Sequence, residues 1–188
     1  MIELLNRIRE VNEVVPTGKK IVHSMGILIA GLILGVSIKQ LDIYANNLGN
    51  VFSQMSVWIL LGTIIAVYSS TPKRAGVNVF LFCIGMLATY YLTADLTGSI
   101  YSWSYIFGWS GFSLCSPIFA YITWYAKGRG WLAKLLAAGI IFFMLTASIM
   151  LFHRIRFSDI IIALLTAFVL FTKKSVGTKD IDKRRLAE

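Results

Sequence analysis

Six long runs of apolar residues follow one another along this 188-residue chain, each separated from the next by a short polar or charged segment. A soluble domain of this size has too little interior to bury them all, because 57% of the residues are hydrophobic and only 14% are charged. A helix needs about 20 apolar residues to cross a membrane, and most of the runs meet that length. We therefore predict an all-α fold, a six-helix transmembrane bundle in the lipid bilayer. The predicted spans are 21–38, 51–68, 77–94, 102–125, 131–152 and 158–172.

The first 18 residues differ from the apolar runs because charged residues alternate with apolar ones. Four apolar residues recur at helical spacing, and they are Leu4, Ile8, Val11 and Val15. Such a pattern is typical of an amphipathic helix that lies on a membrane surface. We expect three parts: a cytoplasmic amphipathic segment at 1–18, a six-span transmembrane domain at 19–172 and a basic cytoplasmic tail at 173–188.

The basic residues are distributed unevenly between the two ends of the predicted spans. If both termini are cytoplasmic, only Lys39, Arg154 and Arg156 lie on the outer side, and the other fifteen of the 18 lie inside. This asymmetry predicts a plasma-membrane protein with cytoplasmic N- and C-termini. The same residues flank apolar runs instead of alternating with aromatic residues on a polar face, so we expect no nucleic-acid partner.

The acidic residues of the membrane domain gather at the predicted outer side. Charges near the hydrocarbon usually face a wet cavity or each other, and this favours an outward-facing polar pocket beneath the polar loop 39–50. Alternatively, these are ordinary loop charges, with Ser158 or Asp159 capping the sixth helix. The candidate ligand residues are Asp42, Asn46, Asp95, His153, Arg154, Arg156 and Asp159.

Small residues form two neighbouring stripes in the first predicted span. Gly26 and Ala30 make one small-xxx-small pair, and Gly31 and Gly35 make the other. Pairs of this kind allow two membrane helices to approach closely. They indicate either packing within the bundle or a surface that docks another membrane protein.

Two resemblances bear on function. The region 58–91 and part of the fourth span resemble a family of small bacterial multi-pass membrane proteins without an assigned function, through the residues Lys73-Arg74-Ala75-Gly76, Tyr90-Tyr91 and Ser116-Pro117-Ile118-Phe119. The layout is also similar to the substrate-binding subunits of energy-coupling-factor transporters. That similarity implies a solute pocket under the first external loop and a first helix that docks a coupling subunit.

Three classes of function stay open at this point. The first is a solute-binding or transport subunit, and the second is a non-catalytic membrane interaction or assembly protein. The third is an unrecognised membrane enzyme, because Gly108-Trp109-Ser110-Gly111 resembles the nucleophile motif of rhomboid proteases. A serine nucleophile needs a base, and the sixth span lacks the histidine that rhomboids carry there. We therefore expect no catalytic residues, no metal site and no cofactor; the expected partner is a small solute or another membrane protein.

Overall fold

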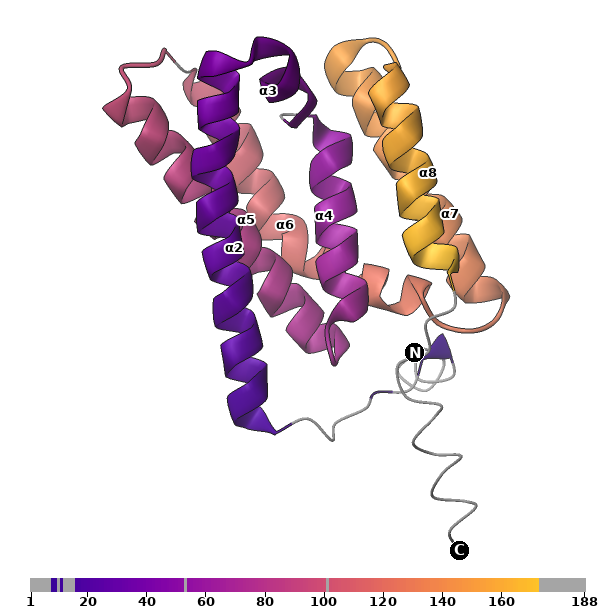
Figure 1. The fold of residues 1–188 in the computed structure, drawn as a ribbon. Helices are drawn as coiled ribbons and strands as arrows, with labels where there is room; N and C mark the ends of the chain where they lie inside the picture. The colour runs from indigo at the N-terminus through magenta and orange to yellow at the C-terminus, as the bar shows by residue number, and fades with distance from the viewer. Residues whose placement is uncertain (1–7, 10, 12–15, 53, 101, 173–188) are drawn as a thin grey trace, which may run out of the picture.

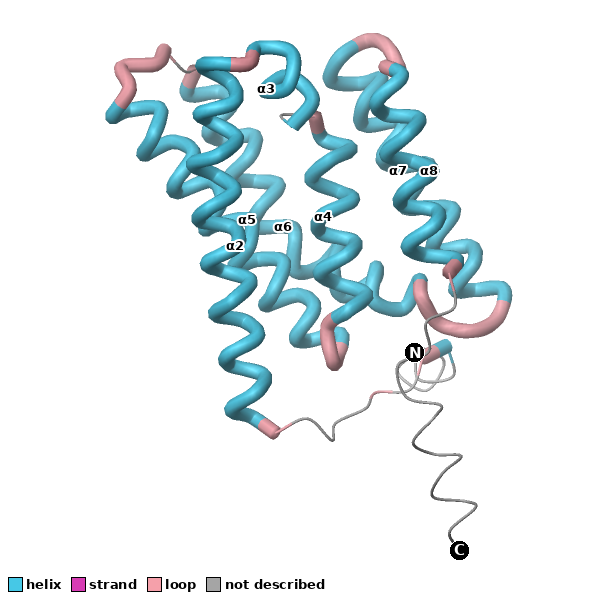
Figure 2. The backbone as a smooth tube through the Cα atoms, in the orientation of Figure 1, coloured by secondary structure: helices cyan, strands magenta, loops and turns pink. Residues whose placement is uncertain are grey.

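The computed structural model describes residues 8, 9, 11, 16–52, 54–100 and 102–172, and the regular structure within them is helical (Figures 1 and 2). Four helices are long and apolar enough to span a membrane, and two apolar helices are shorter. A seventh helix, α3, has only 7 residues. The helices are α2 Thr17–Tyr44, α3 Asn46–Phe52, α4 Met55–Tyr68, α5 Pro72–Leu96, α6 Trp103–Ala126, α7 Trp131–Phe152 and α8 Phe157–Phe171.

The six larger helices alternate in direction (Figure 1). The start of α2 and the end of α8 therefore lie at one end of the bundle, which we call the tail end. The turn from α2 through α3 into α4 lies at the opposite end, which we call the α3 end (Figure 1). In this arrangement α4 contacts α5, α6, α7 and α8, and α2 packs mainly on α5.

The first two spans differ from their predicted bounds. The segment predicted as the polar loop 39–50 is mostly helical, because α2 continues to Tyr44 and α3 follows directly. The predicted span 51–68 is divided between α3 and α4, and α4 keeps 14 residues. At 1.5 Å per residue, α4 is about 21 Å long, and α8 with its 15 residues is about 22 Å long. The predicted amphipathic helix within 1–18 lies largely outside the described residues.

Local sequence explains where two of the helices begin. The Thr71 side chain accepts a hydrogen bond from the Arg74 backbone N–H, and Pro72 occupies the first turn of α5. Both features favour a helix start, because the capping oxygen satisfies a free N–H and proline needs no such partner. They explain why α5 begins five residues before the predicted span. At α8, the backbone N–H of Arg156 donates to the Asp159 carboxylate (2.9 Å).

The contact between α2 and α5 depends on one of the two small-residue stripes. A Cβ atom on Gly31 would lie 2.5 Å from the Phe82 carbonyl oxygen, and one on Gly35 would collide with the carbonyl of Met86. These two glycines therefore allow the backbones of α2 and α5 to touch. Gly26, in contrast, has open space where a Cβ would project.

A buried polar network joins the helices near the tail end. Asn78 is buried on α5, accepts a hydrogen bond from Ser24 on α2 (2.6 Å) and donates one to Ser69 after α4 (2.9 Å). The Arg9 guanidinium donates to two backbone carbonyls, at Val67 near the end of α4 (3.0 Å) and Trp124 near the end of α6 (2.8 Å). The Trp124 indole N–H also donates to the Ser69 carbonyl (2.8 Å), so the network links α2, α4, α5 and α6 and holds Arg9 against them.

Candidate functional site

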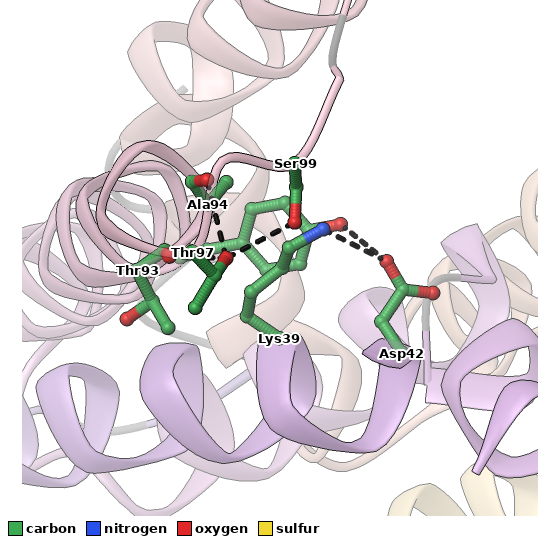
Figure 3. Close-up of polar contacts among 7 residues, drawn as sticks. Lys39, Asp42, Thr93, Ala94, Thr97 and Ser99 are labelled. Carbon is green, nitrogen blue, oxygen red and sulfur yellow. Dashed lines mark hydrogen bonds and ion pairs between the residues drawn. The ribbon is translucent and has the colours of Figure 1, made fainter. Parts of the chain in front are cut away.

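Asp42 lies at the α3 end in a cluster formed by α2 and α5 (Figure 3). Its carboxylate accepts a hydrogen bond from the Tyr90 hydroxyl (3.1 Å) and pairs with the Lys39 ammonium (3.4 Å). Lys39 is only 7% exposed, and a buried cation of this kind is stabilised by a nearby carboxylate. The hydroxyls of Thr97 and Ser99 are hydrogen-bonded to each other nearby (3.0 Å; Figure 3). The hydrogen bond from Tyr90 to the Asp42 carboxylate therefore links α5 to α2.

Two further candidates, Asn46 and Asp95, belong to helices that meet at the α3 end of the bundle. Asn46 begins α3, but its side chain is outside the described part of the structure. Gly49 of α3 packs directly on the Asp42 backbone, where a Cβ would come within 2.5 Å of the Asp42 Cα. Asp95, near the end of α5, is exposed.

Asp159 occupies a different place, between α4, α7 and α8. Only 1% of its surface is exposed, and its carboxylate accepts hydrogen bonds from Ser56 on α4 (2.6 Å) and Ser148 on α7 (3.1 Å). Ser158 also donates to the buried Gln54 side chain (2.9 Å), which adds a second link from α8 to the start of α4. Asp159 therefore both caps α8 and joins three helices.

The remaining candidates lie in the turn between α7 and α8. His153 and Arg154 are exposed, and Arg156 is half-buried. His153 adopts a left-handed backbone conformation (φ 55°) that ends α7. The seven candidate ligand residues are thus distributed over the α2–α5 cluster, the start of α3, the end of α5 and the segment from the α7–α8 turn into the first turn of α8. Since α4 lies between α2 and α8 (Figure 1), the first and last of these places are on opposite sides of α4.

The four small residues proposed for helix packing or docking lie on two different faces of α2. Gly31 and Gly35 are buried against α5, whereas Gly26 and Ala30 are exposed on another face of the helix. Both pairs fit the same sequence rule, and the sequence alone offers no sign of which pair faces the bundle.

A cavity of about 250 Å³ lies between α4, α5, α6 and α7. Its wall is mainly apolar, and none of the seven candidate ligand residues contributes to it. Protein interiors are packed as densely as organic crystals, and they contain few voids larger than a water molecule. A space of this size among four helices is therefore a candidate binding site in the described residues.

The lining of the cavity extends furthest along α6 and α7. On α6 its lining extends from Phe112 to Thr123, and on α7 from Leu135 to Phe143. With a rise of 1.5 Å per residue, these stretches measure about 16 Å and about 12 Å.

Small residues leave this space open. Gly62 on α4, Ala120 on α6 and Gly139 on α7 all line it. A Cβ on Gly139 would meet no atom within 4 Å, and one on Gly62 would make only ordinary contact with Val79. Our sequence interpretation missed these residues. Small residues within bulky apolar runs were a visible signal, but which helices face one another was not.

Few of the residues that line the cavity are polar. The Trp58 side chain is 8% exposed, and its indole N–H has no hydrogen-bond acceptor among the described residues. The Ser116 hydroxyl, in contrast, donates to the carbonyl of Ser113 (2.8 Å). Cys83, a third polar group of the wall, is a free, buried cysteine. The described residues contain no group of three or more His, Cys, Asp or Glu side chains that could hold a metal ion.

Helix length and hydropathy define the class: the chain is a multi-pass helical membrane protein. A more specific assignment does not follow from comparison, because no family model, no curated protein and no solved structure matches the chain.

Proposed function

We propose that the chain is a non-catalytic membrane protein of the solute-binding or transport class, and that it holds an apolar or amphiphilic molecule between α4, α5, α6 and α7. The observation that carries this proposal is the cavity of about 250 Å³ at that position. Ligand sites in proteins are typically mainly apolar hollows between structural elements with few polar groups, and this cavity fits that description. The six-helix layout also resembles that of energy-coupling-factor substrate-binding subunits.

The proposal includes an arrangement in the membrane. All six larger helices cross the bilayer, with 19–172 as the membrane domain and both termini in the cytoplasm. The alternating directions of the helices and the excess of basic residues at the tail end support this arrangement. The two shorter helices, α4 and α8, fall below the roughly 30 Å of a typical hydrocarbon core, so the bilayer thins locally beside them.

Filling the cavity tests this function. A Gly139→Leu substitution places a bulky side chain in the cavity without meeting nearby atoms at its Cβ position. Gly26→Leu is the matched control, because Gly26 also has open space but lies on α2 outside the cavity. Native mass spectrometry of protein released from membranes would measure the bound molecule. We expect the wild-type protein and Gly26→Leu to retain it and Gly139→Leu to lose it. Equal retention by all three proteins would contradict the proposal.

A second candidate function is the docking of another membrane protein on α2. It is favoured by the exposure of Gly26 and Ala30, which leaves one small-residue stripe unused within the described bundle. The same two variants separate the candidates. If docking is the function, Gly26→Leu abolishes cross-linking to the partner in membranes, and Gly139→Leu leaves it intact.

A further inference from the structure

We propose that the starts of α2 and α5 form a binding site for the negatively charged head group of an anionic phospholipid, in the membrane leaflet that borders the tail end. The site is separate from the cavity between α4, α5, α6 and α7. It is carried by the position of four cations, by the charges described at that end and by the apolar surface beside the cations. The four cations, which we call the α2–α5 basic cluster, are Lys19, Lys20, Lys73 and Arg74.

The helix register brings two of these cations to the same level. Helices α2 and α5 both begin at the tail end, so they run in the same direction (Figure 1). The Ser24 hydroxyl donates to the Asn78 side chain (2.6 Å) and sets their register. Lys20 and Arg74 each lie four residues before one of these partners, about one turn nearer the tail end on the same helix face. The register therefore places the two half-buried cations side by side.

Two exposed lysines extend the cluster. Lys19 precedes Lys20, Lys73 precedes Arg74, and the Lys19 and Lys73 side chains are both exposed. The first turns of α2 and α5 contain no acidic residue. Four positive charges thus lie at two adjoining helix starts. They repel one another, and an anion bound among them reduces this repulsion.

No carboxylate of the described residues neutralises the cluster. The acidic residues in the described ranges are Asp42, Asp95 and Asp159. They lie near the end of α2, near the end of α5 and in the first turn of α8, and all three places are at the α3 end. An anion supplied by the surrounding leaflet therefore complements the charge of the cluster.

The surface next to the cations favours a lipid over a soluble anion. Val22 on α2 lies about one turn beyond Lys19 and is 72% exposed, and Val77 on α5 lies about one turn beyond Lys73 and is 47% exposed. A head group bound by the cluster would carry its acyl chains along these apolar residues, which a soluble anion would not use. The proposed arrangement also places the tail end in the cytoplasmic leaflet, whose anionic lipids attract basic residues.

The test compares two lipids that differ in head-group charge. Purified protein is reconstituted with an equimolar mixture of phosphatidylglycerol and phosphatidylcholine of equal chain length, and retained lipid is counted by native mass spectrometry. We expect the wild-type protein to retain phosphatidylglycerol in about fivefold excess or more, since each cation near an anionic membrane surface contributes about a fivefold gain in binding. Lys20→Gln combined with Arg74→Gln should reduce this excess by about fivefold or more.

Two control pairs separate a site from overall charge and from misfolding. Arg129→Gln combined with Lys134→Gln removes the same charge from the tail end, but from exposed positions before and within the first turn of α7. This pair should change the excess by less than about twofold. Lys20→Arg combined with Arg74→Lys keeps both charges of the cluster and should keep the preference for phosphatidylglycerol.

Three results would overturn the inference. The wild-type protein retains both lipids equally, the two glutamine pairs reduce the excess equally, or free inorganic phosphate displaces the phosphatidylglycerol. The last result would assign the cluster to a soluble anion. Gly139→Leu should leave the preference unchanged, because Gly139 lines the cavity and not the cluster. Failure of this site and failure of the proposed function are therefore told apart.

Discussion

The hydroxyl oxygen of Ser56 lies 2.6 Å from a carboxylate oxygen of Asp159, although the two residues are 103 positions apart in the sequence. This hydrogen bond joins the start of α4 to the start of α8, and Ser148 adds α7 through the same oxygen. The second carboxylate oxygen caps α8 by accepting from the Arg156 backbone. One buried side chain therefore fixes the relative positions of three helices.

Replacement of Asp159 by asparagine should destabilise the protein by about 1–3 kcal/mol, because an amide nitrogen would replace one of the two accepting oxygens. Ser56→Ala should cost about 0.5–1.5 kcal/mol, since the other hydrogen bonds to the carboxylate remain. The two changes share one network, so the double variant should lose less than the sum of the single losses. Unfolding in detergent measures all three; strictly additive losses would contradict the shared network.

Alanine should have opposite effects at two glycines of α2. Gly31→Ala drives a methyl group into the Phe82 carbonyl and should destabilise the protein by about 1–3 kcal/mol. Gly26→Ala meets open space and should stabilise it by up to about 1 kcal/mol through helix propensity. Thermal unfolding in one detergent compares the pair. A stabilising Gly31→Ala would show that α2 and α5 are less closely packed than described.

Arg9 should anchor the N-terminal segment to the bundle. Its guanidinium lies 3.9 Å from the centre of the Trp124 ring while donating to two carbonyls near helix C-termini, where partial negative charge accumulates. Burial lowers the pKa of Arg9 to about 10, so the group stays charged at neutral pH. Arg9→Lys retains the charge, but an ammonium group lacks the planar guanidinium that presents several N–H donors at once. Lysine should therefore restore the anchoring of the N-terminal segment only in part.

Limited proteolysis near the N-terminus measures this anchoring. We expect Arg9→Ala to be cut several-fold faster than the wild-type protein and Arg9→Lys to fall between them. Lys19→Ala is the control, because Lys19 is an exposed cation at the start of α2. Equal cleavage rates for Arg9→Ala and Lys19→Ala would argue against an anchor at Arg9.

The orientation in the membrane can be tested with single cysteines in a background without Cys83 and Cys115. Ile100→Cys lies in the exposed turn between α5 and α6, and Thr17→Cys lies at the start of α2. With both termini cytoplasmic, a membrane-impermeant maleimide should label Ile100→Cys in intact cells and Thr17→Cys only after lysis. The reverse pattern would show that the basic tail end faces outward.

The number, type and order of the large helices could be predicted from the sequence, because each apolar run is bounded by charges, glycine or proline. The start of the second span could not. Val51 and Phe52 continue its apolar run, yet they belong to α3, whose fold against Asp42 depends on tertiary contact. Helix propensity and hydropathy do not distinguish one continuous helix over 51–68 from a segment divided between α3 and α4.

The candidate site was harder to predict, because burial depends on which helix faces meet. Asp159 was expected to face an outer pocket, but it is buried against Ser56 and Ser148, which lie in other apolar runs. The capping role considered for it is present. No charged residue in the sequence indicated the cavity. The space is left open by the small residues Gly62 on α4 and Gly139 on α7, and these helices are distant in sequence.

Photocross-linking in a bilayer tests the central claim most directly. A phosphatidylcholine with a diazirine in the middle of one acyl chain is incorporated with the protein, irradiated, and its attachment sites are located by mass spectrometry. We predict that the strongest attachment maps to cavity residues of α6 and α7, around Phe119 and Phe143, and that Gly139→Leu reduces it severalfold while Gly26→Leu does not. Attachment spread evenly over the outer faces of the helices, and unchanged by Gly139→Leu, would contradict a binding site for apolar or amphiphilic molecules in this cavity.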